Sequence, residues 1–70
     1  LKGNAYLVAM NAINEVLVDA FLQDVITYLE IPKKLEEFLS HLTISELATF
    51  EEIIEFDQVI RHDTLQKLKV

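Results

Sequence analysis

Hydrophobic residues dominate a long uninterrupted stretch near the start of the chain, from Asn4 to Ile31. The stretch contains no glycine, proline or basic residue, so nothing in it breaks a helix before Pro32. At about 100° per residue, its polar residues fall along one drifting stripe, and apolar residues cover most of the remaining surface. This pattern predicts a first helix over residues 4–30, with Asn4 as its N-cap.

A second, shorter apolar stripe follows Pro32. Four large apolar residues recur at the i, i+3, i+4, i+7 spacing of one helix face: Leu35, Phe38, Leu39 and Leu42. Proline suits the first turn of a helix and disfavours continuation of the preceding one. The sequence therefore predicts a second helix over residues 32–42 that folds back on the first.

The last third of the chain opens with a capping signal. Thr43 and Glu46 match the S/T-x-x-E capping box, which predicts a third helix over residues 44–56. Beyond Asp57 the apolar spacing slips, so residues 58–69 form either a short separate helix or a continuation of the third. The change of face favours a break near Asp57 or Asp63.

These segments predict a single all-α domain over residues 1–70, a small three- or four-helix bundle with the long N-terminal helix as its spine. The predicted core within the chain consists of Leu35, Phe38, Leu39, Leu47, Phe50, Ile53 and Ile54. Seventy residues with 51% hydrophobic content and no cysteine make a small, apolar chain that disulfides cannot staple. A chain of this length buries only roughly 60% of the surface that its unfolded form exposes. We therefore expect oligomerisation, as a homodimer or higher homo-oligomer, to complete the bundle.

The apolar arc of the first helix is wider than one packing partner needs. The predicted self-interface on this arc consists of Tyr6, Met10, Ile13, Asn14, Leu17, Phe21 and Tyr28. Asn14 has two interpretations: it pairs with its symmetry mate and fixes the register of a dimer, or it lies at the edge of the arc and is solvated. Asp24 is similarly read as a solvated carboxylate where two packing faces diverge.

A formal net charge of −6 changes which partners are plausible. An acidic chain repels phosphate backbones, so no direct nucleic-acid binding is expected. Acidic residues within the first stretch make a membrane span costly, and no signal-peptide pattern opens the chain, which predicts a cytoplasmic location. Glu51, Glu52 and Glu55 form either a docking face for a basic protein partner or a solvated face.

The sequence shows no constellation of catalytic residues. Glu37 and His41 are four residues apart, but two ligands do not make a metal site. No positioned nucleophile or glycine-rich phosphate loop accompanies them, so we expect no enzyme activity and no catalytic, cofactor-binding or metal site.

By elimination, the sequence predicts a non-enzymatic helical module for protein–protein interaction and oligomerisation, acting as a regulatory adaptor. The alternative is the dimerisation portion of a DNA-binding transcription regulator of the helix-turn-helix type. Residues 43–48 and 59–65 resemble its two helices, but no turn signal separates them and the gap between them is too long.

Overall fold

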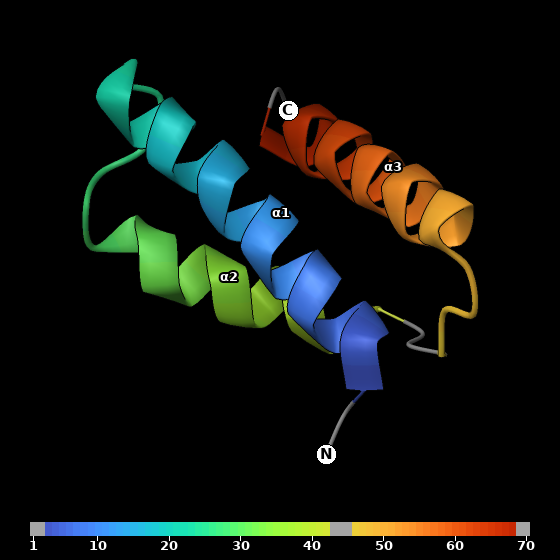
Figure 1. The fold of residues 1–70 in the computed structure, drawn as a ribbon. Helices are drawn as coiled ribbons and strands as arrows, with labels where there is room; N and C mark the ends of the chain where they lie inside the picture. The colour runs from blue at the N-terminus through green and yellow to red at the C-terminus, as the bar shows by residue number, and fades with distance from the viewer. Residues whose placement is uncertain (1–2, 43–45, 69–70) are drawn as a thin grey trace.

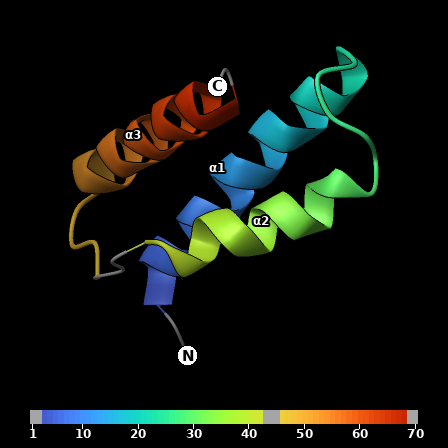
Figure 2. The same ribbon diagram turned by 180° about the vertical axis from the view of Figure 1, so that it is seen from behind.

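Three helices form the described part of the chain, residues 3–42 and 46–68 of the computed structural model. They are α1 (Gly3–Leu22), α2 (Glu30–Ser40) and α3 (Phe50–Leu68). α1 lies between the other two, and both pack along it (Figures 1 and 2). The described ranges contain no strand. The predicted all-helical class is thus confirmed, with α1 as the helix that the other two share.

The end of α1 differs from the prediction of a helix over residues 4–30. The helix stops at Leu22, and Asp24 adopts a left-handed backbone conformation with φ of 63°. The Asp24 N–H donates to the carbonyl of Phe21 at 3.0 Å, and the Val25 N–H donates to that of Ala20 at 2.8 Å. These two bonds form a Schellman motif, in which the left-handed position is usually glycine but tolerates aspartate or asparagine. The prediction was wrong because Asp24 carries no obvious stop signal.

α2 begins at Glu30, two residues before the predicted start at Pro32. The Glu30 carboxylate accepts a hydrogen bond from the Thr27 N–H at 2.7 Å, which satisfies a backbone donor just outside the helix. Pro32 then falls within the first turn, where the missing N–H would have had no acceptor inside the helix. The turn between α1 and α2 is therefore hydrogen-bonded at both ends.

We expect acid to weaken the junction between this turn and α2. Hydrogen bonds from Thr27, the backbone bond first, lower the pKa of Glu30 from its ordinary 4.5, and Lys34 and Lys33 add to the effect. Because the pKa in the folded state lies below that in the unfolded state, Glu30 contributes stability above pH 4.5. That contribution is lost as the pH falls through the lowered value. Denaturant unfolding of the wild type and of Glu30→Gln, repeated across pH, should show a difference at neutral pH that disappears in acid. Glu36→Gln removes one charge from the same helix as a control, and an equal pH profile for the two variants would contradict the assignment.

α3 begins at Phe50 and uses a different capping box from the predicted one. Thr49 Oγ1 accepts from the Glu52 N–H at 3.1 Å, and Glu52 Oε1 accepts from the Thr49 N–H at 3.0 Å. This is a reciprocal S/T-x-x-E box, six residues after the one that the sequence suggested. Residues 46–49 are not helical, so the predicted start at residue 44 is wrong, and Thr43 itself lies outside the described residues.

α3 also runs without the predicted break near Asp57 or Asp63. It is continuous to Leu68, which makes residues 58–68 a continuation of the same helix. Thr64 falls where the apolar spacing slips, but it is buried and its hydroxyl donates to the Ile60 carbonyl at 2.8 Å. A threonine that returns its hydroxyl to the preceding turn can occupy a buried helix face, which the apolar count had missed.

The core is built on a face of α1 that is rich in alanine. The buried hydrophobic residues are Ala5, Ala9, Ala12, Ile13, Val16, Leu17, Ala20, Ile26, Phe38 and Ile60. Phe38 of α2 enters this core from one side and Ile60 of α3 from the other. The ammonium group of Lys67 lies 5.1 Å from the centre of the Phe38 ring, which adds a contact between α3 and α2.

The predicted core within the chain is only partly correct. Phe38 is buried, Leu35 and Leu39 are partly buried against the core, and Leu47 and Ile53 are half-buried. Phe50 and Ile54 are 72% and 43% exposed, so their assignment to the core was wrong. The first three residues of α3, Phe50 to Glu52, are all exposed, so this end of the helix contributes little to the core.

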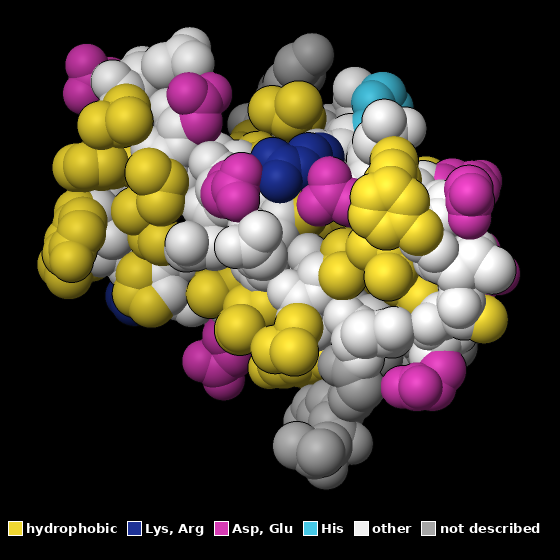
Figure 3. Space-filling model, viewed as in Figure 1, with side chains coloured by type: hydrophobic (Ala, Val, Ile, Leu, Met, Phe, Trp, Pro, Cys, Tyr) yellow, Lys and Arg dark blue, Asp and Glu magenta, His cyan; other side chains and the backbone are white. Residues whose placement is uncertain are grey.

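Large apolar side chains remain on the surface. Figure 3 shows one group at the end of the molecule where α1 meets its following turn, and others toward the start of α3.

α1 is also long and apolar enough to cross a membrane, with a mean hydropathy of 1.4 over Asn4–Leu22. Length and composition alone are weak evidence for a span, because the core helix of a soluble protein has the same properties. Here 39% of that segment is buried against the rest of the chain.

Candidate functional site

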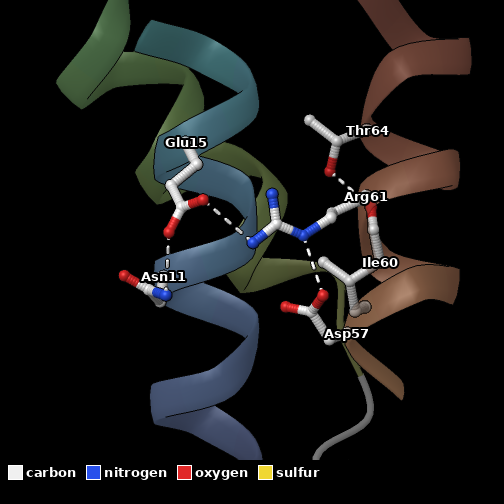
Figure 4. A network of polar contacts seen from close by, with 6 residues as sticks. All are labelled: Asn11, Glu15, Asp57, Ile60, Arg61 and Thr64. Atoms are coloured by element: carbon white, nitrogen blue, oxygen red, sulfur yellow. Dashed lines mark hydrogen bonds and ion pairs between the residues drawn. The ribbon is translucent and has the colours of Figure 1, made fainter. Parts of the chain in front are cut away.

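A connected group of polar side chains links α1 to α3 (Figure 4). Arg61 of α3 donates through Nη2 to Glu15 Oε1 of α1 at 3.0 Å and through Nε to Asp57 Oδ2 at 2.8 Å. Asn11 Nδ2 in turn donates to the second oxygen of Glu15 at 3.1 Å. One guanidinium thus joins two carboxylates from different helices, and an amide fixes the orientation of one of them.

The electrostatics of this group are those of a clamp between helices. The hydrogen bond that Arg61 donates to Asp57, then the one that it donates to Glu15, raises the pKa of Arg61 above its ordinary value, so the guanidinium stays charged. The Arg61 side chain is 35% exposed, and those of Glu15 and Asp57 are 51% and 29% exposed. Both carboxylates already accept from protein donors, and each pair lies partly in solvent. The arrangement positions α3 on α1.

We expect the interhelical pair to contribute modestly and in a salt-dependent way. A double-mutant cycle with Arg61→Gln and Glu15→Gln should give a coupling of about 0.2–1 kcal/mol, as for partly exposed ion pairs. The coupling should shrink at high salt, where screening is strong. The cycle of Arg61 with Asp57 is the matched control, since it tests a pair within one helix. A Glu15–Arg61 coupling of zero at low salt would contradict the clamp.

The predicted self-interface is divided between the core and the surface. Ile13 and Leu17 are 1% and 0% exposed, so neither can contact another molecule, and their assignment to an interface was wrong. Both lie on the face of α1 that α2 and α3 cover. The sequence showed that this arc was apolar, but not which part of it the chain itself would bury.

The remaining interface candidates lie in different places. Tyr6 and Met10 line a groove of about 570 Å³ between α1 and α2, together with Leu35, Leu39 and Leu42. Phe21 is half-buried and meets Tyr28 edge to face, with ring centres 5.7 Å apart, and Tyr28 is 68% exposed. Asn14 is exposed, as is Asp24. Self-association through the exposed members of this set stays a prediction.

The acidic residues of α3 have separate roles. Glu51, Glu52 and Glu55 are all exposed. Glu52 is engaged in the cap of α3, where its carboxylate accepts from the N–H groups of Ala48 and Thr49 at 2.7 and 3.0 Å. A basic protein partner for this face stays a prediction, and Glu52 already has a structural role at the helix start.

One long-range contact could not be anticipated from the sequence. The Asn4 side chain donates to the Leu47 carbonyl at 2.9 Å and accepts from the Leu47 N–H at 3.1 Å. Asn4 lies inside α1, which begins at Gly3, so its predicted role as N-cap was wrong. It instead fastens the segment before α3 to the start of α1. No spacing rule connects residues 43 positions apart in a chain.

The histidines are separate from one another and from the clamp. His41 follows the end of α2 and His62 lies on α3, and both side chains are exposed. Within residues 3–42 and 46–68, no group of three or more histidine, cysteine, aspartate or glutamate side chains could hold a metal ion.

The pattern of the whole chain, rather than any one motif, identifies its family. Residues 1–63 match the family model described as "DXP reductoisomerase C-terminal domain". The chain belongs to this family. Nine-tenths of the sequence, including α1, α2 and most of α3, falls within the match.

Individual reductoisomerases show the same relationship. The chain is 34% identical over 65 residues to the 1-deoxy-D-xylulose 5-phosphate reductoisomerase of Proteus mirabilis (strain HI4320), covering 93% of this chain and 16% of that enzyme. It is 35% identical over 68 residues to the enzyme of the same name from Ruthia magnifica subsp. Calyptogena magnifica, covering 97% of this chain and 18% of the relative. The chain therefore spans less than a fifth of the length of these relatives. No solved structure matches it significantly.

Membership of this family corrects the predicted function. A regulatory adaptor and a part of a DNA-binding regulator are both wrong, since the family and its relatives are named for an enzyme. The prediction that the chain has no part in an enzyme is wrong for the same reason. The residues that suggested an interaction module instead belong to a small helical domain of the reductoisomerase family.

Proposed function

We propose that this chain is the C-terminal helical domain of a bacterial 1-deoxy-D-xylulose 5-phosphate reductoisomerase. The observation that carries the proposal is the family match, which runs through nearly the whole three-helix unit. In the complete polypeptide the chain supports the fold of the enzyme, and the groups that react with 1-deoxy-D-xylulose 5-phosphate lie in the larger remainder.

The contacts within the domain support a structural role for this chain and a catalytic role for the remainder. The titratable side chains with the clearest contacts have structural roles: Arg61 joins α1 to α3, Glu30 holds the turn before α2, and Glu52 caps α3. The relatives are about six times as long as the matched segment. The remainder of such a polypeptide has ample length for a site that binds a sugar phosphate.

The substrate named in the relatives supports a cytoplasmic location for the proposed enzyme. A sugar phosphate carries negative charge and does not cross a lipid bilayer unaided, because burying an ionised group in hydrocarbon is costly. An enzyme that consumes such a compound needs access to the compartment in which it is made. We therefore place the complete enzyme in the cytoplasm.

The proposal is tested by activity of the complete polypeptide that carries this chain. Conversion of 1-deoxy-D-xylulose 5-phosphate, followed by phosphorus NMR with NADH and NADPH each supplied as hydride donor, is the expected result. No conversion with either donor would overturn it.

Replacing both exposed histidines, as His41→Gln and His62→Gln, should leave turnover unchanged, because the reacting groups lie elsewhere. A large loss of kcat with the fold intact would place chemistry in this domain.

A chimera makes the test specific to the domain. The matching segment of the Proteus mirabilis enzyme is exchanged for this chain, and the chimera should retain conversion of the same substrate. Leu17→Asp in the chimera should abolish activity, because a charge in the core unfolds the domain. Gln66→Asp, an exposed site on α3, is the matched control and should have little effect.

A further inference from the structure

The turn between α1 and α2 presents a dense group of exposed apolar side chains. Four large residues within eight positions are mostly exposed: Leu22 at 71%, Val25 at 58%, Tyr28 at 68% and Leu29 at 72%. We call these four residues the turn patch. They lie at the end of the molecule opposite the start of α3 (Figures 1 and 3). Isolated exposed apolar residues are ordinary, but a contiguous group marks a contact surface.

The backbone of the turn patch is held in place. The Schellman bonds of Asp24 and Val25 fix its beginning, and the bond from Thr27 to Glu30 fixes its end. The Tyr28 ring packs edge to face on Phe21 with an interplanar angle of 62°. Ile26, in the middle of the turn, is 8% exposed and anchors the turn to the core. A surface that is ordered before it docks loses little conformational entropy on binding.

We propose that the turn patch docks against the remainder of the same reductoisomerase polypeptide, an inference that rests on the proposed function. More than four-fifths of each relative lies outside the matched segment, and under the proposed function such a remainder is tethered to the patch at high effective concentration. The occupant is an apolar recess with a basic rim. Burying the four side chains removes their exposed apolar surface from water, which favours docking.

Charge around the turn patch selects this occupant over a second copy of the domain. Asp19, Asp24 and Glu30 accompany the patch along the sequence, Lys33 and Lys34 follow it on α2, and the chain as a whole carries a net charge of −6. Two copies meeting through this patch would bring like charges together at its edge, which opposes association. A recess bordered by lysine or arginine would instead gain from the same three carboxylates.

Hydroxyl-radical footprinting of the complete wild-type enzyme tests the proposal without any substitution. Tyr28 and Leu29 should be labelled several-fold more slowly than their intrinsic reactivities and their exposure in this structure predict. Phe50 provides the internal reference, because it is as exposed as Leu29 but lies at the start of α3. Unprotected labelling of Tyr28 and Leu29 would overturn the proposal. Protection that disappears when the enzyme is diluted to monomers would also overturn it, since a second copy would then be the cover.

A pair of matched variants adds an independent readout. Leu29→Gln should lower the equilibrium constant for docking of the patch at least about tenfold. This is the effect of removing one large apolar side chain from a contact. Labelling of Tyr28 should rise accordingly. Phe50→Gln, a change at an equally exposed site, should leave Tyr28 protected; equal effects of the two variants would contradict docking through the patch.

Conversion of 1-deoxy-D-xylulose 5-phosphate by the wild type is measured separately. An active enzyme with an unprotected patch disproves only the docking, and an inactive enzyme disproves the proposed function whatever the footprint shows.

Discussion

Leu17→Ala is expected to lower the free energy of unfolding of the domain by about 2–5 kcal/mol. Leu17 is 0% exposed and lies in the second half of α1, within the cluster that joins all three helices. Removing three carbons there leaves a cavity that the surrounding helices can only partly close. A domain of this size has a total stability of roughly 0.05–0.15 kcal/mol per residue, so the loss is a large share of it.

Denaturant unfolding followed by circular dichroism measures this prediction directly. Leu7→Ala is the matched control, because it makes the same chemical change on the same helix at a residue that is 60% exposed. The control should change the stability by no more than about 0.5 kcal/mol. If both variants shift the unfolding midpoint equally, Leu17 is not in the core. The interface that the sequence predicted for Leu17 would then deserve a second test.

Helix content was predictable because it depends on local patterns that the sequence displays. The i, i+3, i+4, i+7 stripe from Leu35 to Leu42 corresponds to α2 within a few residues. Helix ends were less predictable, because they depend on single backbone choices. α1 stops at a Schellman motif with aspartate where glycine is usual, and α3 takes the second of two similar capping boxes. The two capping boxes match the same sequence pattern, so tertiary packing decides which of them begins the helix.

The core was harder to predict because large apolar residues draw attention and small ones do not. Tyr6, Met10 and Phe21 dominate the apolar arc of the first helix by size, yet they are only half-buried. The residues that α2 and α3 cover most completely include Ala9 and Ala12, both at 0% exposure. Small side chains allow helices to approach closely, so an alanine face can be the most buried one. Hydrophobicity summed by residue type therefore pointed to the wrong part of the helix.

The polar clamp and the family lay beyond single-sequence reasoning for different reasons. Asp57 and Arg61 are visible as an i, i+4 pair, but Glu15 joins them only after α1 and α3 meet. The sequence shows no short catalytic motif, and the family match extends over residues 1–63. The apolar excess was read as a sign of self-association. Under the proposed function, the same excess belongs to the surface by which the domain contacts the rest of a longer polypeptide.

Ala12→Leu is the second change with a large expected effect, and it tests the alanine face itself. Three added carbons at a site with 0% exposure must displace a neighbouring helix or force strained rotamers, which typically costs about 1–3 kcal/mol. Asn14→Leu introduces the same residue two positions away, where the side chain is exposed, and should be neutral or stabilising by a few tenths of a kcal/mol because leucine is the better helix former. The two variants have the same product residue on the same helix, so their difference in unfolding midpoint isolates the packing. Equal midpoints would mean that α2 and α3 do not close over Ala12. A lower midpoint for Ala12→Leu alone would show that stability depends on close helix approach at this face, and not on the larger apolar residues around it.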